Sequence, residues 1–175
     1  MKRQNDSRDR VRWLCVCAML MAVNIVMSSF SVPVPGGHLY LNDIIIDTAA
    51  LLLDPLGAFL VGGVGAFLGD FFFYPAPMFV SLVTRGAQAA LIALLVRRSA
   101  KNEALASIPA LAFGALIGIV GFTLGRAFVY GTPAAALLKL PYQILMGVGG
   151  ALIAWLLCWK CGLAKAYRSW RGSVE

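Results

Sequence analysis

Residues 41–73 read LNDIIIDTAALLLDPLGAFLVGGVGAFLGDFFF, and the way this stretch divides decides the fold. As a single helix it would be about 50 Å long, well beyond the roughly 30 Å hydrocarbon core of a bilayer. Asp54-Pro55 supplies a division, because Asp at an N-cap accepts hydrogen bonds from free N–H groups and Pro suits the first helical turn. We therefore expect a short helix before Asp54, either tilted or partly re-entrant, and a new helix after it.

The chain as a whole is too apolar for a soluble domain. Hydrophobic residues make up 60% of its 175 residues, charged residues make up 13%, and the mean hydropathy is +0.81. These values indicate one small integral membrane protein. Windows of membrane-spanning length predict an all-α fold of six transmembrane helices. The apolar segments lie near residues 13–30, 41–53, 55–73, 78–96, 105–130 and 134–159.

The basic residues predict the orientation. The net charge of +7 could suggest nucleic-acid binding, but the basic side chains gather in three clusters beside apolar segments, as the positive-inside rule requires. The clusters are Lys2, Arg3, Arg8, Arg10 and Arg12; Arg97, Arg98 and Lys101; and Lys160, Lys165, Arg168 and Arg171. They share one side only if residues 41–73 cross the membrane twice or not at all. We expect a cytoplasmic basic tail over 1–12, a membrane domain over 13–160, a cytoplasmic basic tail over 161–175, and outer loops at 31–40, 74–77 and 130–133.

Six ionisable residues lie inside the apolar segments, and this topology places them at or outside the membrane midpoint. They are Asp43, Asp47, Asp70, Arg85, Arg126 and Lys139. A charge in lipid is costly unless it faces a partner, a cavity or a ligand. Capping, snorkelling or mutual pairing could explain most of them equally well. Arg85 lies nearest the middle of its helix, so a ligand or buried partner is favoured there.

Helical spacing groups these charges with polar and aromatic side chains. Ser81, Arg85 and Gln88 share one predicted face, as do Phe122, Arg126 and Tyr130, and as do Lys139, Tyr142 and Gln143. Rings to stack on and a few fixed donors and acceptors suit a flat polar heterocycle. We expect an outward-facing binding pocket.

Motifs for chemistry are missing from the sequence. The single histidine, His38, falls in a predicted loop, and there is no HExxH, GxSxG or GxxxxGK[ST] pattern. The pairs Cys15/Cys17 and Cys158/Cys161 have the wrong helical spacing for a zinc site. We therefore expect no enzyme activity, metal or cofactor, and any uphill transport would need a partner or an ion gradient.

Several short motifs together resemble a known family. They are Gly37-His38-Leu39-Tyr40-Leu41-Asn42-Asp43, Ala49-Ala50-Leu51-Leu52-Leu53-Asp54-Pro55-Leu56-Gly57-Ala58, Gly62-Gly63-Val64-Gly65, Leu68-Gly69-Asp70, Arg85-Gly86, Gly121-Phe122, Phe128-Val129-Tyr130-Gly131 and Pro141-Tyr142-Gln143. In order and spacing they resemble the substrate-binding S components of energy-coupling factor (ECF) vitamin transporters. The likeness is greatest to carriers of riboflavin, hydroxymethylpyrimidine and pyridoxine.

The resemblance implies a substrate-binding subunit for ATP-driven vitamin uptake in a prokaryotic cell membrane. S components bind a vitamin or precursor in the outer half of six helices, with the first outer loop as a lid. They then dock on a membrane coupling subunit carried by two cytoplasmic ATPases, and topple to release the ligand inside. Ala18 and Ala22 match the docking motif of the first helix. The predicted substrate-binding residues are Asn42, Asp43, Asp70, Arg85, Arg126, Lys139, Tyr142 and Gln143.

Three of these positions depart from the pattern of related carriers. Arg126 stands where an acid is frequent, Arg85 where Lys is frequent, and Gln143 where Asn is common. We therefore expect a ligand with more negative charge, or more acceptors, than neutral vitamins carry. A solitary or ion-coupled carrier is the alternative function, because Asp43 and Asp47, one turn apart, could relay protons.

Overall fold

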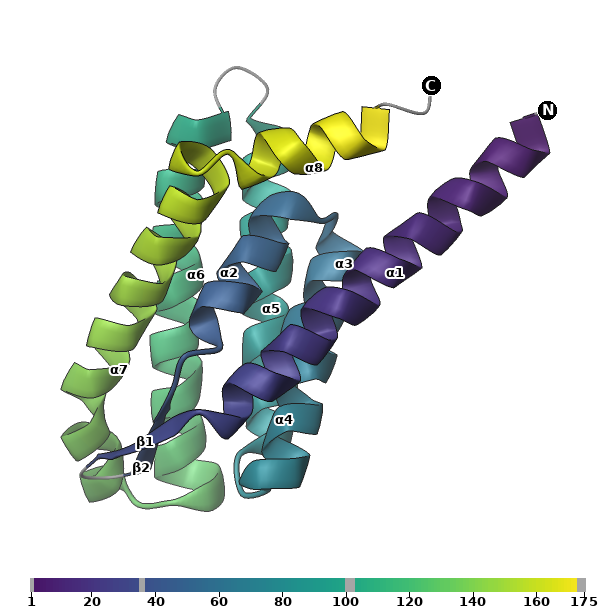
Figure 1. Ribbon diagram of the computed structural model, residues 1–175. Coiled ribbons are helices and arrows are strands. Elements are labelled where there is room, and N and C mark those ends of the chain that lie inside the picture. The colour runs from purple at the N-terminus through teal and green to yellow at the C-terminus, as the bar shows by residue number, and fades with distance from the viewer. Residues whose placement is uncertain (1, 35–36, 100–102, 173–175) are drawn as a thin grey trace.

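The computed structural model describes residues 2–34, 37–99 and 103–172, so Lys101 of the middle basic cluster and residues 173–175 of the predicted C-terminal tail lie outside it. Helices form nearly all of the described chain, and one hairpin joins the first two of them (Figure 1). The elements are α1 (Lys2–Ser29), β1 (Ser31–Val34), β2 (Gly37–Tyr40), α2 (Asp43–Leu52), α3 (Pro55–Phe59), η1 (Leu60–Val64), α4 (Gly65–Phe73), α5 (Met78–Arg98), α6 (Glu103–Gly125), η2 (Arg126–Tyr130), α7 (Pro133–Trp155), η3 (Leu156–Lys160) and α8 (Leu163–Gly172).

All six predicted apolar segments are helical, and five helices of the described chain are long and apolar enough to cross a membrane. These five are Asp9–Ser29, Pro55–Phe73, Met78–Arg98, Glu103–Tyr130 and Pro133–Lys160. The π-helical turns η1, η2 and η3 lie within three of them. The remaining segment forms α2, which has only 10 residues, as expected for a short second helix. Whether α2 crosses the membrane stays a prediction.

The predicted break at Asp54-Pro55 is present, but the capping detail was wrong. Asp54 is extended (ψ 164°), and Pro55 begins α3. Within the described chain the Asp54 side chain makes no capping hydrogen bond. Its carboxylate instead accepts a hydrogen bond from Trp13 Nε1 of α1. A capping side chain would accept from the second or third residue of the helix, but here the half-buried indole N–H takes the carboxylate oxygen as its acceptor.

The predicted outer loop at 31–40 forms two strands over 31–34 and 37–40, and its residues 35–36 lie outside the described chain. β1 and β2 pair antiparallel, from Ser31 opposite Tyr40 to Val34 opposite Gly37. The predicted all-α fold class therefore holds for the bundle, with a two-stranded hairpin added to it. The hairpin lies at the end of the bundle opposite the N-terminus and α8, and the C-terminal end of α5 lies with α8 (Figure 1). The described parts of the three basic clusters thus share one end.

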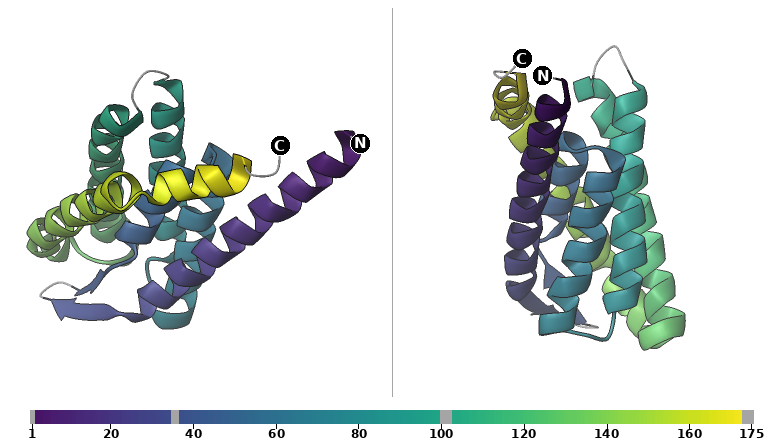
Figure 2. Two further views of the ribbon diagram at one scale, coloured as in Figure 1. Left: turned by 45° about the horizontal axis from the view of Figure 1, so that its top comes forward. Right: turned by 90° about the vertical axis from the view of Figure 1, so that its right-hand side faces the viewer.

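α8 extends the chain across that end, turning at Gly162 with φ 78°. Figures 1 and 2 show α8 at a steep angle to α7 and close to the level of the first turns of α1. The predicted C-terminal tail is thus largely helical in its described part, whereas only its basic charge was predicted. The N-terminal half of α1 diverges from the bundle in Figure 1 and in the left-hand view of Figure 2.

Small residues bring the helices together, as their four-residue spacing predicts. On α6, Gly114, Gly118, Gly121 and Gly125 pack against side chains of α5. Asn24 and Ser28 of α1 face Gly65 and Gly69 of α4, and Asn24 Nδ2 donates to the Val61 carbonyl of η1 at 2.8 Å. A buried apolar cluster around Ile46, Ala89 and Ile92 joins α2 to α5.

Gly63→Ala is expected to destabilise the protein by about 1–3 kcal/mol, because it overpacks a helix contact. A methyl group at this position would lie 2.8 Å from the Leu82 carbonyl oxygen and 3.0 Å from Gly86 Cα, both backbone atoms of α5. Thermal unfolding in detergent measures the loss. Gly149→Ala is the matched control, since its methyl group meets nothing within 4 Å; helix propensity should leave that variant as stable or slightly more so. Equal stability of the two variants would contradict the close packing of η1 on α5.

Candidate binding site

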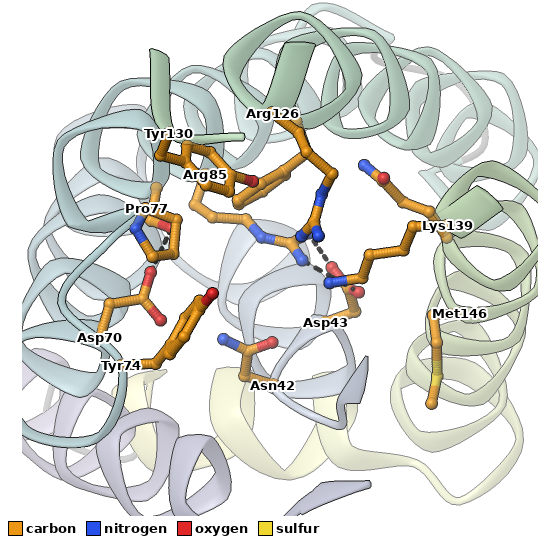
Figure 3. A pocket seen from close by; sticks show the side chains of 13 residues that line it. Asn42, Asp43, Asp70, Tyr74, Pro77, Arg85, Arg126, Tyr130, Lys139 and Met146 are labelled. Carbon is orange, nitrogen blue, oxygen red and sulfur yellow. Dashed lines mark hydrogen bonds and ion pairs between the residues drawn. The ribbon is translucent and has the colours of Figure 1, made fainter. Parts of the chain in front are cut away.

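A cavity opens among α2, α4, α5, α6, η2 and α7 at the hairpin end of the bundle (Figure 3). It holds about 600 Å³ of space not filled by atoms, part of it open to the outside. Seven of the eight predicted site residues line it: Asn42, Asp43, Asp70, Arg85, Arg126, Lys139 and Gln143. Helix ends account for the gathering, because α2 begins, α4 ends and α7 begins at this depth.

Arg85 lies at the centre of the site. Its guanidinium forms a two-pronged ion pair with Asp43, in which Nη1 bonds Oδ1 and Nη2 bonds Oδ2 at 3.2 Å. The guanidinium also lies 4.7 Å from the centre of the Phe122 ring. Only 12% of the Arg85 side chain and 7% of the Asp43 side chain are exposed. The attraction between the two side chains offsets the desolvation free energy of burying both charges. The pair lies in the wall of an open cavity.

A second layer of polar groups, further from the cavity, supports Arg85. Gln88 Oε1 accepts from Arg85 Nη1 at 3.0 Å, and Gln88 Nε2 donates to Asp47 Oδ1 at 3.1 Å. Asp47 and Gln88 are each 1% exposed. Asp47 was grouped with the pocket charges by sequence, but the structure places it behind Gln88 and outside the cavity lining.

The remaining charges lie on opposite walls. Asp70 of α4 accepts a hydrogen bond from Ser81 of α5, and Figure 3 shows Tyr74 and Asn42 on the same side of the cavity. On the other side the guanidinium of Arg126 lies 5.3 Å from the Tyr130 ring centre, and Lys139 of α7 projects inward. The cavity therefore has an acidic wall and a basic wall, with the Arg85–Asp43 pair between them.

Asn42 lines the cavity, but its side-chain oxygen is turned away from the open space. The residue is only 4% exposed, and its Oδ1 is fully buried with no hydrogen-bond partner among the described residues. Leaving a buried carbonyl oxygen unsatisfied costs about 1–3 kcal/mol. A ligand would meet this oxygen only after the side chain had turned.

Six further residues line the cavity: Tyr74, Pro77, Ser81, Phe122, Tyr130 and Met146. Ser81, Phe122 and Tyr130 were on the predicted polar faces but were not counted as site residues. Met146 could have been predicted from helical spacing, because it lies one turn beyond Gln143 on the same face of α7. Tyr74 and Pro77 follow α4 in a predicted outer loop, where spacing gives no direction.

Tyr142, the eighth predicted site residue, does not line the cavity. It lies half-buried on α7, outside the residues that line the cavity. Lys139, Gln143 and Met146 form the inward stripe, and Tyr142 is turned about 100° from its neighbour Gln143. Gln143 itself donates to the carbonyls of Gly118 at 3.1 Å and Ile119 at 3.4 Å, so it also ties α7 to α6.

The predicted docking residues lie away from this cavity. Ala18 and Ala22 are exposed on α1, while Cys17, Asn24 and Ser28 on the other side of that helix are buried against the bundle. The structure thus leaves a small-residue face uncovered.

Membrane-spanning helices that enclose a small charged cavity at one end define a substrate-binding membrane protein. Over residues 9–165 the sequence matches the family model described as "ECF-type riboflavin transporter, S component". The chain belongs to this family, and it is a substrate-binding subunit of an ECF transporter and a multi-pass membrane protein.

A solved structure supports the fold. The chain is similar to the one described in "Structure and mechanism of the S component of a bacterial ECF transporter", with a TM-score of 0.67 and 19% sequence identity. The match covers 87% of this chain and 96% of that one. No curated protein matches the sequence.

Proposed function

We propose that this protein captures a vitamin or vitamin precursor from outside a prokaryotic cell and passes it to an ATP-driven transporter. The cavity at the end of the bundle opposite the basic clusters carries this proposal. By the positive-inside rule, that end faces outward. A membrane coupling subunit with two cytoplasmic ATPases would supply the energy, since the sequence has no phosphate-binding loop of its own.

Riboflavin is the first candidate ligand. The family carries its name, and the cavity offers the rings of Phe122, Tyr130 and Tyr74 for stacking. The two charged walls add the fixed polar groups that orient a heterocycle.

Ligand release from the purified protein tests this proposal directly. The protein is purified in detergent, denatured, and the released small molecules are identified by mass spectrometry. We expect a vitamin or precursor, and a yellow preparation would indicate a flavin. If no such molecule is released, and no candidate vitamin binds in a titration, the proposal is wrong.

The charges of the cavity favour an electron-rich ligand. Arg85, Arg126 and Lys139 outnumber Asp43 and Asp70, so the lining carries an excess of one positive charge when all five are ionised. Riboflavin is uncharged at neutral pH, so we propose that the cavity binds still more tightly a ligand that bears negative charge, or more acceptors than neutral vitamins bear, as the departures at Arg85, Arg126 and Gln143 suggested.

Arg126→Glu is expected to weaken binding of the released ligand at least tenfold, or about 1.4 kcal/mol. The substitution turns the excess positive charge into a negative one beside Lys139, in a partly desolvated site. Isothermal titration of the purified variant measures the change. Tyr142→Phe, outside the cavity, should bind within about twofold of the unchanged protein. Unchanged affinity in Arg126→Glu would remove the charge preference.

An ion-coupled carrier remains the alternative, with Asp43 and Asp47 as a proton relay. Arg85 and Gln88 lie between the two carboxylates, and neither a guanidinium nor an amide passes on a proton readily. This arrangement weighs against the relay. Uptake that persists in cells without any ATPase partner would favour it.

A further inference from the structure

We propose that Asp47, although outside the cavity, sets the position of Arg85 by fixing the amide of Gln88, and so acts as a positioning residue for ligand binding. The effect on ligand rests on the proposed function. The link between the side chains stands on contacts alone: Asp43, Arg85, Gln88 and Asp47 form one chain of hydrogen bonds between α2 and α5.

The direction of this chain follows from its Arg85 end. A guanidinium only donates hydrogen bonds, so Arg85 Nη1 requires the oxygen of Gln88 to face it. The NH₂ group of Gln88 then faces Asp47, whose Oδ1 accepts from it and holds the amide in this orientation. A flipped amide would place NH₂ against the guanidinium. That contact would be unfavourable in a buried site that offers little water instead.

Gly118 of α6 makes room for this amide. A methyl group at Gly118 would lie 2.8 Å from Gln88 Oε1 and 3.7 Å from Arg85 Nη1. The Gly118 carbonyl accepts from Gln143 on its other side. One turn of α6 therefore contacts both Gln88, behind the cavity, and Gln143, which lines it.

Arg85 is thus held from three directions. Asp43 binds two of its nitrogens, Gln88 binds one of them from below, and the Phe122 ring lies beside its plane. A side chain fixed in this way loses less entropy when a ligand binds to it. Without Asp47, Gln88 can rotate, and Arg85 loses the support on its inner side.

Variants of Asp47 and Gln88 test the effect on ligand, with riboflavin as the probe in a fluorescence titration. We expect Asp47→Leu and Gln88→Leu each to weaken binding roughly tenfold, and the double variant to be no weaker than either single one. Asp47→Asn should bind within about twofold of the unchanged protein, because the Asn oxygen still accepts from Gln88. Thr48→Val is the matched control, since Thr48 is the next residue of α2, is 4% exposed, and has a hydroxyl with no partner among the described residues.

Three results would overturn the inference. If Asp47→Asn binds as weakly as Asp47→Leu, charge rather than orientation matters. If the losses of the two Leu variants add, the residues act separately. If Thr48→Val is equally damaging, the effect is a general disturbance of α2.

A ligand-free measurement separates this inference from the proposed function. In thermal unfolding, Asp47→Leu and Arg85→Met should be non-additive, because methionine has no donor for Gln88, so that Asp47 no longer supports a bond beyond the Gln88 amide. We expect the double variant to unfold roughly 2–4 °C above the temperature calculated by adding the shifts of the two single variants. This excess should vanish when the same substitutions are made in Gln88→Leu protein. If riboflavin does not bind, the ligand assignment is wrong, and the comparison of unfolding temperatures alone tests the link from Asp47 to Arg85. Additivity, or coupling that survives Gln88→Leu, would overturn the inference.

Discussion

Arg85→Met is expected to destabilise the protein by about 3–5 kcal/mol and to abolish ligand binding. The substitution removes the cation from a buried ion pair and leaves the Asp43 carboxylate, with only 7% of its side chain exposed, without its partner. It also removes the charge at the centre of the cavity wall. Thermal unfolding of the purified protein in detergent measures the first effect, and titration with riboflavin or the co-purified ligand measures the second.

The double variant Asp43→Asn/Arg85→Met separates the two effects. Removing both charges leaves no unpaired carboxylate at position 43, so most of the lost stability should return. Binding should not return, because the guanidinium is still missing. If the double variant is as unstable as Arg85→Met alone, then the helix contacts of Arg85, rather than its charge, hold this part of the fold.

The helical part of the fold was readable from the sequence because hydrophobic length and helix breakers are local signals. Asp54-Pro55 ended one helix and began another where expected. The hairpin at 31–40 was not predicted, since two strands of four residues, one of them containing Pro33, carry little β signal. The short strands exist here because the bundle holds the ends of α1 and α2 on either side of them.

The depth of the charges could be predicted, but their partners could not. Spacing placed Asp43, Asp70 and Arg85 near one level of the membrane. Which acid pairs with Arg85 depends on how α2 and α4 are rotated about their axes, and a turn such as η1 changes that rotation. Asp43 takes the guanidinium while Asp70 takes the hydroxyl of Ser81.

The same limit explains Tyr142 and Met146. A stripe of three residues on a helix covers a wide arc, so spacing alone does not tell which edge of the arc faces the cavity. Contacts between α7 and α6, such as the bond from Gln143 to Gly118, fix the rotation of α7. These contacts cannot be read from either helix alone.

Replacing both Ala18 and Ala22 by tryptophan is expected to reduce ATP-driven uptake at least tenfold while ligand binding by the purified subunit stays within about twofold. Both alanines are exposed on α1, on the side away from its contacts with η1 and α4. Small residues at this spacing allow two helix backbones to approach closely in lipid, where packing rather than a hydrophobic force drives association. Two indole rings would hold a coupling subunit away from α1 without touching the cavity.

Uptake of labelled ligand into cells that express the complete transporter measures the effect, and pull-down of the coupling subunit measures docking. Leu145→Trp is the control, because Leu145 is 69% exposed on α7 and a large ring there should be accommodated by lipid. Normal uptake by the double tryptophan variant would show that docking does not use this face of α1. Loss of both uptake and ligand binding would instead show that α1 shapes the cavity. The two rings would then act by disturbing the packing of Asn24 and Ser28 on η1 and α4.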